Sequence, residues 1–415
     1  MSQSGARVLF LLMLVFMLCT TVVRAEDWAR FRGPRGDGIS ADEKIPTEWS
    51  DSKNIKWKLK LPGAGFSSPI VIGKHIFVTA YEGSREEVER HLVCVSRSTG
   101  DIVWKKSVTG VSDGGEPGFA YHGQASHTPV SDGEHVFAMF GSSGVRAFTM
   151  SGELVWEQQL GNQRASRFGT ASSPILHGNL LIVTAGAEAK AMFAFDKKTG
   201  KQVWKASAGS FSASYSTPLV VARPGSEAEL LFSVQEELWS LNPLTGKLKW
   251  YAETKVDTAA CPAVIVKDDI AYVIGGRSGG RTAVRIGGKG DVTDSNVVWS
   301  FRIGSYVPSP VLHNGRLYWV TDKGVALCVD AKTGQELGRR RIGGQYYASV
   351  VLIKDKLYAV SRFSGTRVLA ATPEFDEIAH NTLTDDSDFS GSPAVSDGQL
   401  LIRSDKFLYC IAVDE

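Results

Sequence analysis

The chain has 415 residues, of which 43% are hydrophobic and 22% are charged. Its 46 lysines and arginines nearly balance 44 aspartates and glutamates, so the formal net charge is only +2. This balance excludes the dense basic surface of a dedicated nucleic-acid-binding protein. The length exceeds a single ordinary core, which indicates either several domains or a repeat architecture.

The N-terminus is the most strongly biased part of the chain. Arg7 precedes the apolar run Val8 to Leu18, and Val23-Arg24-Ala25 offers small residues where a signal peptidase cleaves. Because the run is short for a membrane span of about 20 residues, we expect residues 1–25 to be a cleaved signal peptide. An uncleaved membrane anchor is the alternative. Cys19 follows a leucine rather than a small residue, which disfavours lipidation. We therefore expect a periplasmic or secreted protein with no transmembrane segment after signal cleavage.

A repeated unit fills most of the remaining chain. Each unit opens with a small residue before proline, followed by a β-rich run, at a mean spacing of about 46 residues. The openings are Ser68-Pro69, Thr128-Pro129, Ser173-Pro174, Thr217-Pro218, Cys261-Pro262, Ser309-Pro310, the degenerate Ser349-Val350, and Ser392-Pro393. In the sixth unit, two apolar runs flank the turn Asn314-Gly315, which is typical of a hairpin, and two further strands follow. Four short strands per unit, without helical periodicity, predict an all-β protein: an eight-bladed β-propeller of four-stranded antiparallel blades.

A Thr-Gly turn and a tryptophan recur at the fourth strand of many units. Thr199-Gly200 precedes Trp204, for example, and Thr99-Gly100 precedes Trp104 in the same register. Glycine supplies the positive φ that such a turn needs. We expect each indole to dock between neighbouring blades, where its burial contributes up to roughly 4–6 kcal/mol. The tryptophans expected in this structural role are Trp57, Trp104, Trp156, Trp204, Trp250 and Trp299.

This pattern resembles the tryptophan-docking motif of PQQ-type β-propeller repeats. Phe195-Asp196, Thr199-Gly200 and Trp204 form the cleanest copy, and the resemblance covers about residues 55 to 415. Gly338 replaces the tryptophan of unit six, and unit seven lacks the Thr-Gly turn, so we expect those blades to pack less regularly.

The segment after the signal resembles a stretch found in exported members of the same repeat family. It reads Trp-x-x-Phe-Arg-Gly-Pro from Trp28 onward. We expect it to strap across the propeller, anchored by Trp28 and Phe31. Alternatively, its arginines face an anionic partner.

The last unit lacks a fourth strand after residues 407–413, whereas a spare strand, Ile55 to Leu59 with Trp57, precedes unit one. We expect this strand to complete blade eight, because an incomplete blade would leave an open sheet edge. Seven blades plus an unrelated strand is the alternative. The predicted organisation is a signal peptide at 1–25, an N-terminal strap at 26–54 and an eight-bladed PQQ-like propeller at 55–415.

The inner strands bring two sets of side chains to one end of the central channel. The residue before each proline forms a ring of eight small side chains, explained either by crowding near the axis or by ligand binding. Aromatic residues shortly before these positions are expected on loops that bind a partner, or packed against adjacent loops. The insertion 110–126 contains His122 and lies next to His127, and Arg277–Arg281 forms a second polar loop. Neither has metal-ligand spacing, so no metal is expected. The candidate binding face comprises Phe66, Tyr121, His122, His127, Tyr215, Tyr306, Tyr347 and Phe389.

The resemblance implies two classes of function. PQQ-dependent dehydrogenases share a disulfide between adjacent cysteines, a calcium site and a catalytic aspartate. This sequence has no Cys-Cys pair, and no calcium set can be placed in it. In size and repeat type the chain is similar to the BamB-like propeller component of the outer-membrane β-barrel assembly machinery, which binds protein and performs no chemistry. That component is a lipoprotein, and this chain differs from it in lacking a lipidation signal.

We therefore expect a monomeric, non-catalytic binding or scaffold propeller with a protein partner in the bacterial cell envelope. No cofactor, no catalytic residue and no nucleic acid are expected. The alternatives are a quinoprotein dehydrogenase with PQQ and calcium, and a glycan-binding or glycan-processing propeller.

Overall fold

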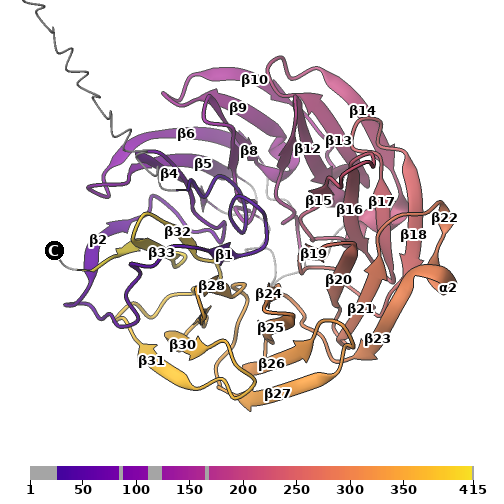
Figure 1. The fold of residues 1–415 in the computed structure, drawn as a ribbon. Coiled ribbons are helices and arrows are strands. Elements are labelled where there is room, and N and C mark those ends of the chain that lie inside the picture. Colours follow the sequence, from indigo (N-terminus) through magenta and orange to yellow (C-terminus); the bar gives the residue numbers. More distant parts are fainter. Residues whose placement is uncertain (1–25, 84–86, 111–123, 164–167, 414–415) are drawn as a thin grey trace, which may run out of the picture.

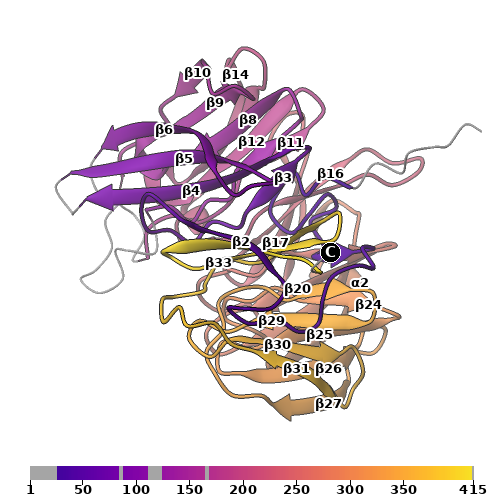
Figure 2. The same ribbon diagram turned by 90° about the vertical axis from the view of Figure 1, so that its left-hand side faces the viewer.

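The computed structural model describes residues 26–83, 87–110, 124–163 and 168–413. Tyr121, His122 and the expected signal peptide lie outside these ranges. The strands form eight sheets, which are arranged around a central axis (Figure 1), and Figure 2 shows the same ring turned by 90°. No helix in the described part of the chain is long and apolar enough to span a membrane.

Each blade is built on four antiparallel strands, which in seven of the eight blades follow one another in chain order from the axis outward (Figure 1). The first four blades are β3 (Ile70–Ile72), β4 (His75–Gly83), β5 (Val88–Ser96) and β6 (Ile102–Gly110); β7 (Val130–Ser131), β8 (His135–Met139), β9 (Val145–Thr149) and β10 (Leu154–Gln158); β11 (Ile175–His177), β12 (Leu180–Ala185), β13 (Ala191–Asp196) and β14 (Gln202–Ser207); and β15 (Leu219–Val221), β16 (Glu229–Val234), β17 (Glu237–Leu241) and β18 (Leu248–Glu253).

The other four blades are β19 (Ile265–Lys267), β20 (Ile270–Gly275), β21 (Gly280–Arg285) and β23 (Val297–Arg302); β24 (Val311–His313), β25 (Arg316–Val320), β26 (Val325–Asp330) and β27 (Glu336–Arg341); β28 (Val351–Ile353), β29 (Lys356–Val360), β30 (Thr366–Ala370) and β31 (Glu377–Asn381); and β32 (Ala394–Ser396), β33 (Gln399–Arg403), β34 (Phe407–Ile411) and β2 (Ile55–Lys60). Short additional elements are β1 (Ile39–Ser40), β22 (Gly290–Asp291), α1 (Gly186–Ala189), α2 (Thr293–Asn296), η1 (Gly141–Ser143) and η2 (Gly209–Ala213). The eight-bladed all-β prediction is confirmed.

Blade eight is closed by the N-terminal strand. β2 pairs antiparallel with β34, and Trp57 lies opposite Cys410 in that ladder. The pairing satisfies the outer edge of β34, which would otherwise expose unpaired backbone groups. The predicted closure is confirmed.

Five of the six tryptophans lie between their own blade and the next one along the chain. Each donates its indole Nε1–H to a backbone carbonyl in the turn of that next blade: Trp57 to Arg97 (3.0 Å), Trp104 to Met150 (3.1 Å), Trp156 to Lys197 (2.9 Å), Trp204 to Pro243 (3.0 Å) and Trp299 to Ala331 (3.1 Å). The ring then packs flat on the turn glycine. At Gly200 a Cβ would lie 2.6 Å from the Trp156 ring, and the φ of +71° also favours glycine.

Trp250 is an exception to this regular pattern. It is completely buried between blades four and five, but its Nε1–H goes to the carboxylate of Glu229 in its own blade. The cause is an insertion between β21 and β23, which replaces the Thr-Gly turn of blade five. Within it, β22 pairs in parallel with β18 and sets Gly290 opposite Trp250. Without a turn carbonyl at this place, the indole needs another acceptor.

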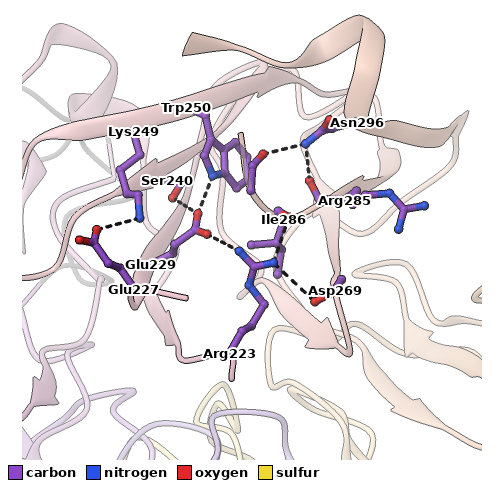
Figure 3. A network of polar contacts seen from close by, with 11 residues as sticks. Arg223, Glu227, Glu229, Ser240, Lys249, Trp250, Asp269, Arg285, Ile286 and Asn296 are labelled. Atoms are coloured by element: carbon purple, nitrogen blue, oxygen red, sulfur yellow. Dashed lines mark hydrogen bonds and ion pairs between the residues drawn. The ribbon is translucent and has the colours of Figure 1, made fainter. Parts of the chain in front are cut away.

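Figure 3 shows how Glu229 is held in that seam. Its carboxylate accepts from Ser240 Oγ at 2.6 Å and forms an ion pair with Arg223 at 2.6 Å. Arg223 then reaches blade five, where it donates to the carbonyl of Ile286 at 3.3 Å and lies 3.5 Å from Asp269. A charged network thus links blades four and five, whereas five other pairs of neighbouring blades are linked by a hydrogen bond from an indole to a carbonyl.

The seam between blades six and seven lacks a tryptophan and is filled differently. A Cβ on Gly338 would lie 2.0 Å from the carbonyl oxygen of Pro373, so the backbone of blade seven occupies the space of the missing indole. Tyr318 donates its hydroxyl to the carbonyl of Ala371 at 2.8 Å and packs edge-on against Phe375. Less regular packing was expected for blades six and seven; at their seam, the phenol ring of Tyr318 stands in place of an indole.

The strap supplies the ring at the seam between blades seven and eight. Ala379 stands at the tryptophan position of β31, opposite Val368. Trp49, which is 4% exposed, stacks on Tyr358 at 6.3 Å, and its backbone N–H donates to the side chain of Asn381. An indole from outside the repeats thus packs where the repeat has none.

The first part of the strap crosses one end of the channel. The carbonyl of Ala29 accepts from the N–H of Ser131 in blade two, and the carbonyl of Gly38 accepts from Leu352 in blade seven. β1 then pairs in parallel with β28. Trp28 is 2% exposed and bridges Val71, so it packs against blade one. Phe31 enters the channel.

Candidate functional site

The centre of the propeller holds a pocket built from two stacked rings of side chains. Side chains alternate along an extended chain, so the positions two and four residues before each inner strand both face the axis. The lower ring is Ser68, Thr128, Ser173, Thr217, Ala263, Ser309, Ser349 and Ser392, and the upper ring is Phe66, Ser126, Ala171, Tyr215, Cys261, Val307, Tyr347 and Ser390. Except for Ala263, these residues line one cavity of about 210 Å³, together with Phe31, Phe168, Arg277 and Tyr306.

Cys261 does not belong to the ring in which the sequence pattern placed it. The inner strand of blade five begins at Ile265, opposite Tyr272, so the residue equivalent to Ser309 is Ala263. Cys261 lies two residues earlier, in the upper ring. Proline is only a local marker of the blade opening, whereas the register is set by pairing with the second strand. Burial raises the pKa of the Cys261 thiol to about 12, which keeps it protonated at neutral pH.

The lower ring is a circle of hydrogen bonds. Six of its seven hydroxyls accept the backbone N–H of the equivalent residue in the preceding blade, at 2.9 to 3.2 Å: Thr128, Ser173, Thr217, Ser309, Ser349 and Ser392. Small size alone was one explanation of these residues. The bonds add a second, since each hydroxyl satisfies a buried backbone donor near the axis. Among the described residues the circle lacks such a bond at two places: between blades four and five, where Ala263 has no hydroxyl, and between blades eight and one, where Ser68 accepts none.

The predicted aromatic residues divide into two groups. Phe66, Tyr215 and Tyr347 lie in the upper ring, and Tyr306, one residue before Val307, also lines the cavity. Phe389 does not. It is 8% exposed and stacks on Tyr409 at 6.0 Å inside blade eight, because it is one residue out of phase with Ser390.

His127 also points away from the pocket. It lies between Ser126 and Thr128, so alternation turns its side chain into the blades, where it is 1% exposed. Its Nε2 bonds to the hydroxyl of Thr170. Burial, and secondarily Arg90, lower the pKa of His127 to about 3, so the ring is neutral. Tyr121 and His122 fall outside the described residues.

Seven lining residues were not among the predicted site residues; besides the smaller side chains of the upper ring, they include Phe168, Arg277 and Phe31. Arg277 lies in the turn between β20 and β21, and its guanidinium is 5.5 Å from the ring centre of Phe168 and 5.2 Å from that of Tyr306. It also donates to the Tyr306 hydroxyl at 3.4 Å. The sequence singled out the polar loop that carries Arg277, but gave no signal that it reaches the axis. Its other arginine, Arg281, is buried and bonds instead to backbone carbonyls, among them that of Gly334.

The strap closes the other end of the pocket. Phe31 lines the cavity, and the guanidinium of Arg32 donates to the carbonyls of Ser309 and Pro310 directly behind it. Burial lowers the pKa of Arg30 and of Arg32 to about 10, so both stay charged at neutral pH. The pocket therefore opens toward the upper ring and has arginines at its mouth and behind its floor.

Two groups of side chains elsewhere have metal-ligand composition: Glu82, Glu89 and His91; and Asp132, Glu134 and His135. Both already contain a lysine partner, since Lys105 lies 3.8 Å from Glu82 and Lys197 lies 2.8 Å from Asp132. The described lining of the central pocket contains no carboxylate. Calcium takes six to eight oxygens and usually includes carboxylates among them. The pocket thus fits the aromatic, anionic body of PQQ better than it fits the accompanying calcium ion.

Comparisons with known proteins agree with this architecture. Solved structures with a similar fold include BamB from Moraxella catarrhalis, with a TM-score of 0.63, 14% identity and coverage of 87% of this chain and 98% of that one. A europium-containing methanol dehydrogenase has a TM-score of 0.68 at 9% identity, with 94% of this chain and 98% of that chain covered. A quinohemoprotein alcohol dehydrogenase from Pseudomonas putida gives 0.62 at 10% identity, covering 93% and 80%. At these identities the likeness concerns the fold alone.

Sequence comparison is more specific. The tetrathionate hydrolase of Acidithiobacillus ferrooxidans is 25% identical over 204 residues, which are 46% of this chain and 38% of that protein. The chain thus matches well under half of the length of this curated relative. A family model described as outer membrane protein assembly factor BamB matches residues 47–186 and 142–382. Because these matches span most of the chain, the protein belongs to the family of BamB-like PQQ-type propellers.

Proposed function

We propose that this chain is an exported, non-catalytic binding propeller that takes a protein partner of the bacterial cell envelope at the mouth of its central pocket. The observation that carries the proposal is the composition of the mouth. Tyrosine, phenylalanine and arginine side chains are gathered there; all three are enriched in protein interfaces, and tyrosine and arginine are also enriched at their energetic centres.

The rim is also held in place before any partner arrives. Phe168 packs edge-on against Tyr215 at 6.2 Å, and Arg277 lies over both Phe168 and Tyr306. On the other side of the mouth, Arg362 lies 4.4 Å from the ring centre of Tyr347 and is anchored by Asp388. Preorganised side chains lose little conformational entropy on binding, which favours affinity. Family membership supports a role in the envelope, in the periplasm or outside the cell. The proposal takes the chain to act as a monomer.

The proposal is tested with the purified chain immobilised and exposed to envelope extract. Wild type is compared with a rim variant, Tyr306→Ser with Tyr347→Ser, and with a matched control, Leu244→Ser with Leu248→Ser, which alters exposed apolar side chains on the outside of blade four. Melting temperatures of all three chains are measured alongside. We expect a specific protein to be retained by wild type and control and reduced at least ten-fold by the rim variant. Equal retention by a folded rim variant would refute the proposed site.

A quinoprotein dehydrogenase is the second candidate. The pocket's aromatic lining and Arg277 favour it, since PQQ is a planar aromatic carboxylate. Titration with PQQ and calcium, followed by cofactor absorbance and dye-linked oxidation of alcohols and sugars, separates the two. We expect no saturable binding and no turnover. Saturable binding with turnover would replace the binding proposal by an enzymatic one.

A further inference from the structure

The two ends of the central pocket are positively charged. Arg277 is the only charged side chain among the described lining residues, and within the described part of the chain it forms no ion pair. Behind the floor, Arg32 is 2% exposed and is satisfied by backbone carbonyls, with Nη2 2.8 Å from the carbonyl of Asp37 and Nη1 3.4 Å from that of Ser309. Charges enclosed by low-dielectric protein act strongly on a ligand. The pocket therefore favours an anion.

The wall of the pocket offers hydrogen-bond donors. A serine or threonine hydroxyl has one donor hydrogen and two acceptor lone pairs. In the lower ring, six hydroxyls already use a lone pair on a backbone N–H, and none of the described hydrogen bonds uses their O–H groups. These hydroxyls are buried, with exposed fractions of 1% to 6%. Their O–H groups are therefore free to donate to a ligand. A carboxylate suits them because it accepts hydrogen bonds without donating any.

The remaining lining is apolar and the space is small. The cavity of about 210 Å³ is below the roughly 300–1,000 Å³ of sites that enclose a whole small-molecule ligand. The half-buried rings of Phe66, Tyr215 and Tyr347 surround its upper level. Because the strap blocks the far end, a polypeptide cannot thread through it. Among the known modes of peptide recognition, a blind pocket with converging donors suits the capture of a chain end.

We infer that the central pocket binds the carboxyl-terminal residue of a partner polypeptide, with a large apolar or aromatic side chain against the upper ring and the terminal carboxylate facing Arg277 and the lower-ring hydroxyls. The inference rests on the proposed function, since it names the part of the protein partner that enters the site. It adds a chemical requirement: the carboxylate must be free and the last side chain must be apolar.

The test uses fluorescein-labelled pentapeptides of the form Gly-Ser-Gly-Ser-Phe and fluorescence polarisation with the intact chain. One peptide ends in a free acid, one in an amide, and a third has the phenylalanine in the middle with a terminal glycine acid. Arg277→Gln removes the charge at the mouth. Arg285→Gln is the matched control, because Arg285 is exposed in the same blade and does not line the pocket. Ala171→Trp fills the upper ring, and melting temperatures verify that each variant is folded.

We expect the free acid to bind wild type and the Arg285→Gln control equally, and the amide and internal-phenylalanine peptides to bind at least ten-fold more weakly. Arg277→Gln should weaken the free acid by about ten-fold or more, as expected for loss of one partner of a charge-assisted hydrogen bond. It should also reduce the difference between acid and amide. Ala171→Trp should abolish binding.

Equal affinity for acid and amide would overturn the inference, as would binding of PQQ or phenylacetate with no peptide binding. These outcomes are distinct from failure of the proposed function. If the rim variant still loses its partner from extract while acid and amide peptides bind alike, the pocket mouth is an interface and only the chain-end inference fails. If the rim variant keeps its partner, the proposed function itself fails.

Discussion

The indole of Trp250 donates its hydrogen bond to the carboxylate of Glu229 within the same blade, whereas five other tryptophans donate to a carbonyl of the next blade. The same seam, between blades four and five, lacks the hydroxyl link of the lower ring because Ala263 stands there. Both regular connections are thus replaced at one place, and the ion pair of Glu229 with Arg223 takes over. The stability of this seam depends on a buried charge.

Glu229→Ala should therefore destabilise the chain strongly. The substitution leaves the buried Nε1–H of Trp250 and the hydroxyl of Ser240 without their acceptor, at a cost of about 1–3 kcal/mol for each unsatisfied group. It also removes the shorter ion pair of Arg223, which keeps only the one with Asp269 at 3.5 Å. The free energy of unfolding is measured by urea denaturation at pH 7. Glu227→Ala is the control: Glu227 is 76% exposed and pairs with Lys249 at 3.5 Å, so its loss should change stability by no more than about 0.5 kcal/mol. Similar effects of the two substitutions would contradict the role given to the network.

Gly338→Ala tests whether blade seven really fills the space of the missing indole. A single added Cβ would meet the carbonyl of Pro373 at 2.0 Å, so we expect a loss of about 1–3 kcal/mol in the free energy of unfolding from overpacking. Gly209→Ala, where a Cβ would meet nothing within 4 Å, should be near neutral. A stabilised Gly338→Ala chain would show that the seam is open rather than filled.

Ala263→Ser should add the link that the hydroxyl circle lacks between blades four and five. The new hydroxyl would stand where the other blades accept the N–H of the preceding blade, here that of Thr217, and we expect a gain of about 0.5–1.5 kcal/mol in the free energy of unfolding. Ala271→Ser places a hydroxyl at another fully buried alanine of the same blade, away from the circle, and should cost about 1–3 kcal/mol. If both serines destabilise the chain, the backbone at position 263 does not place a hydroxyl as the equivalent positions of the other blades do.

His127 predicts a dependence of stability on pH. Its folded-state pKa is about 3, below the usual 6.5, so between those values the unfolded chain binds a proton that the folded chain does not. Stability should fall as the pH falls through this window, by about 2 kcal/mol from pH 7 to pH 5 for this one group. His127→Asn removes the titrating ring. The difference between the urea midpoints at pH 7 and pH 5 should be smaller in the variant than in wild type. An unchanged difference would rule out His127 as a contributor.

Much of the repeat architecture could be predicted from local patterns. The strand runs and the Thr-Gly turn depend on backbone preferences of a few neighbouring residues. Both recur along the chain, so a unit with a weak pattern can be assigned from the others. The closing strand with Trp57 followed from the same reasoning, because a blade with three strands leaves an edge that must pair. Phe66, Tyr215 and Tyr347 reached the pocket because they share the register of the inner strands.

Residues outside the repeat register needed the tertiary structure. Phe389 and His127 were one position out of phase and turned into the blades, and Cys261 was displaced by two because blade five starts its strand later than its proline suggests. Arg277 and Phe168 reach the mouth from loops, and Phe31 and Arg32 reach the floor from the strap.

By itself, the sequence determined the blade, its number of copies and the ring of small side chains at the axis, because these depend on periodicity that every unit repeats. Only the tertiary structure decided that the channel is a blind pocket, apolar above, lined with donors below and positively charged at both ends. Those properties come from segments far apart in the chain, and their positions depend on long-range packing that no local pattern encodes.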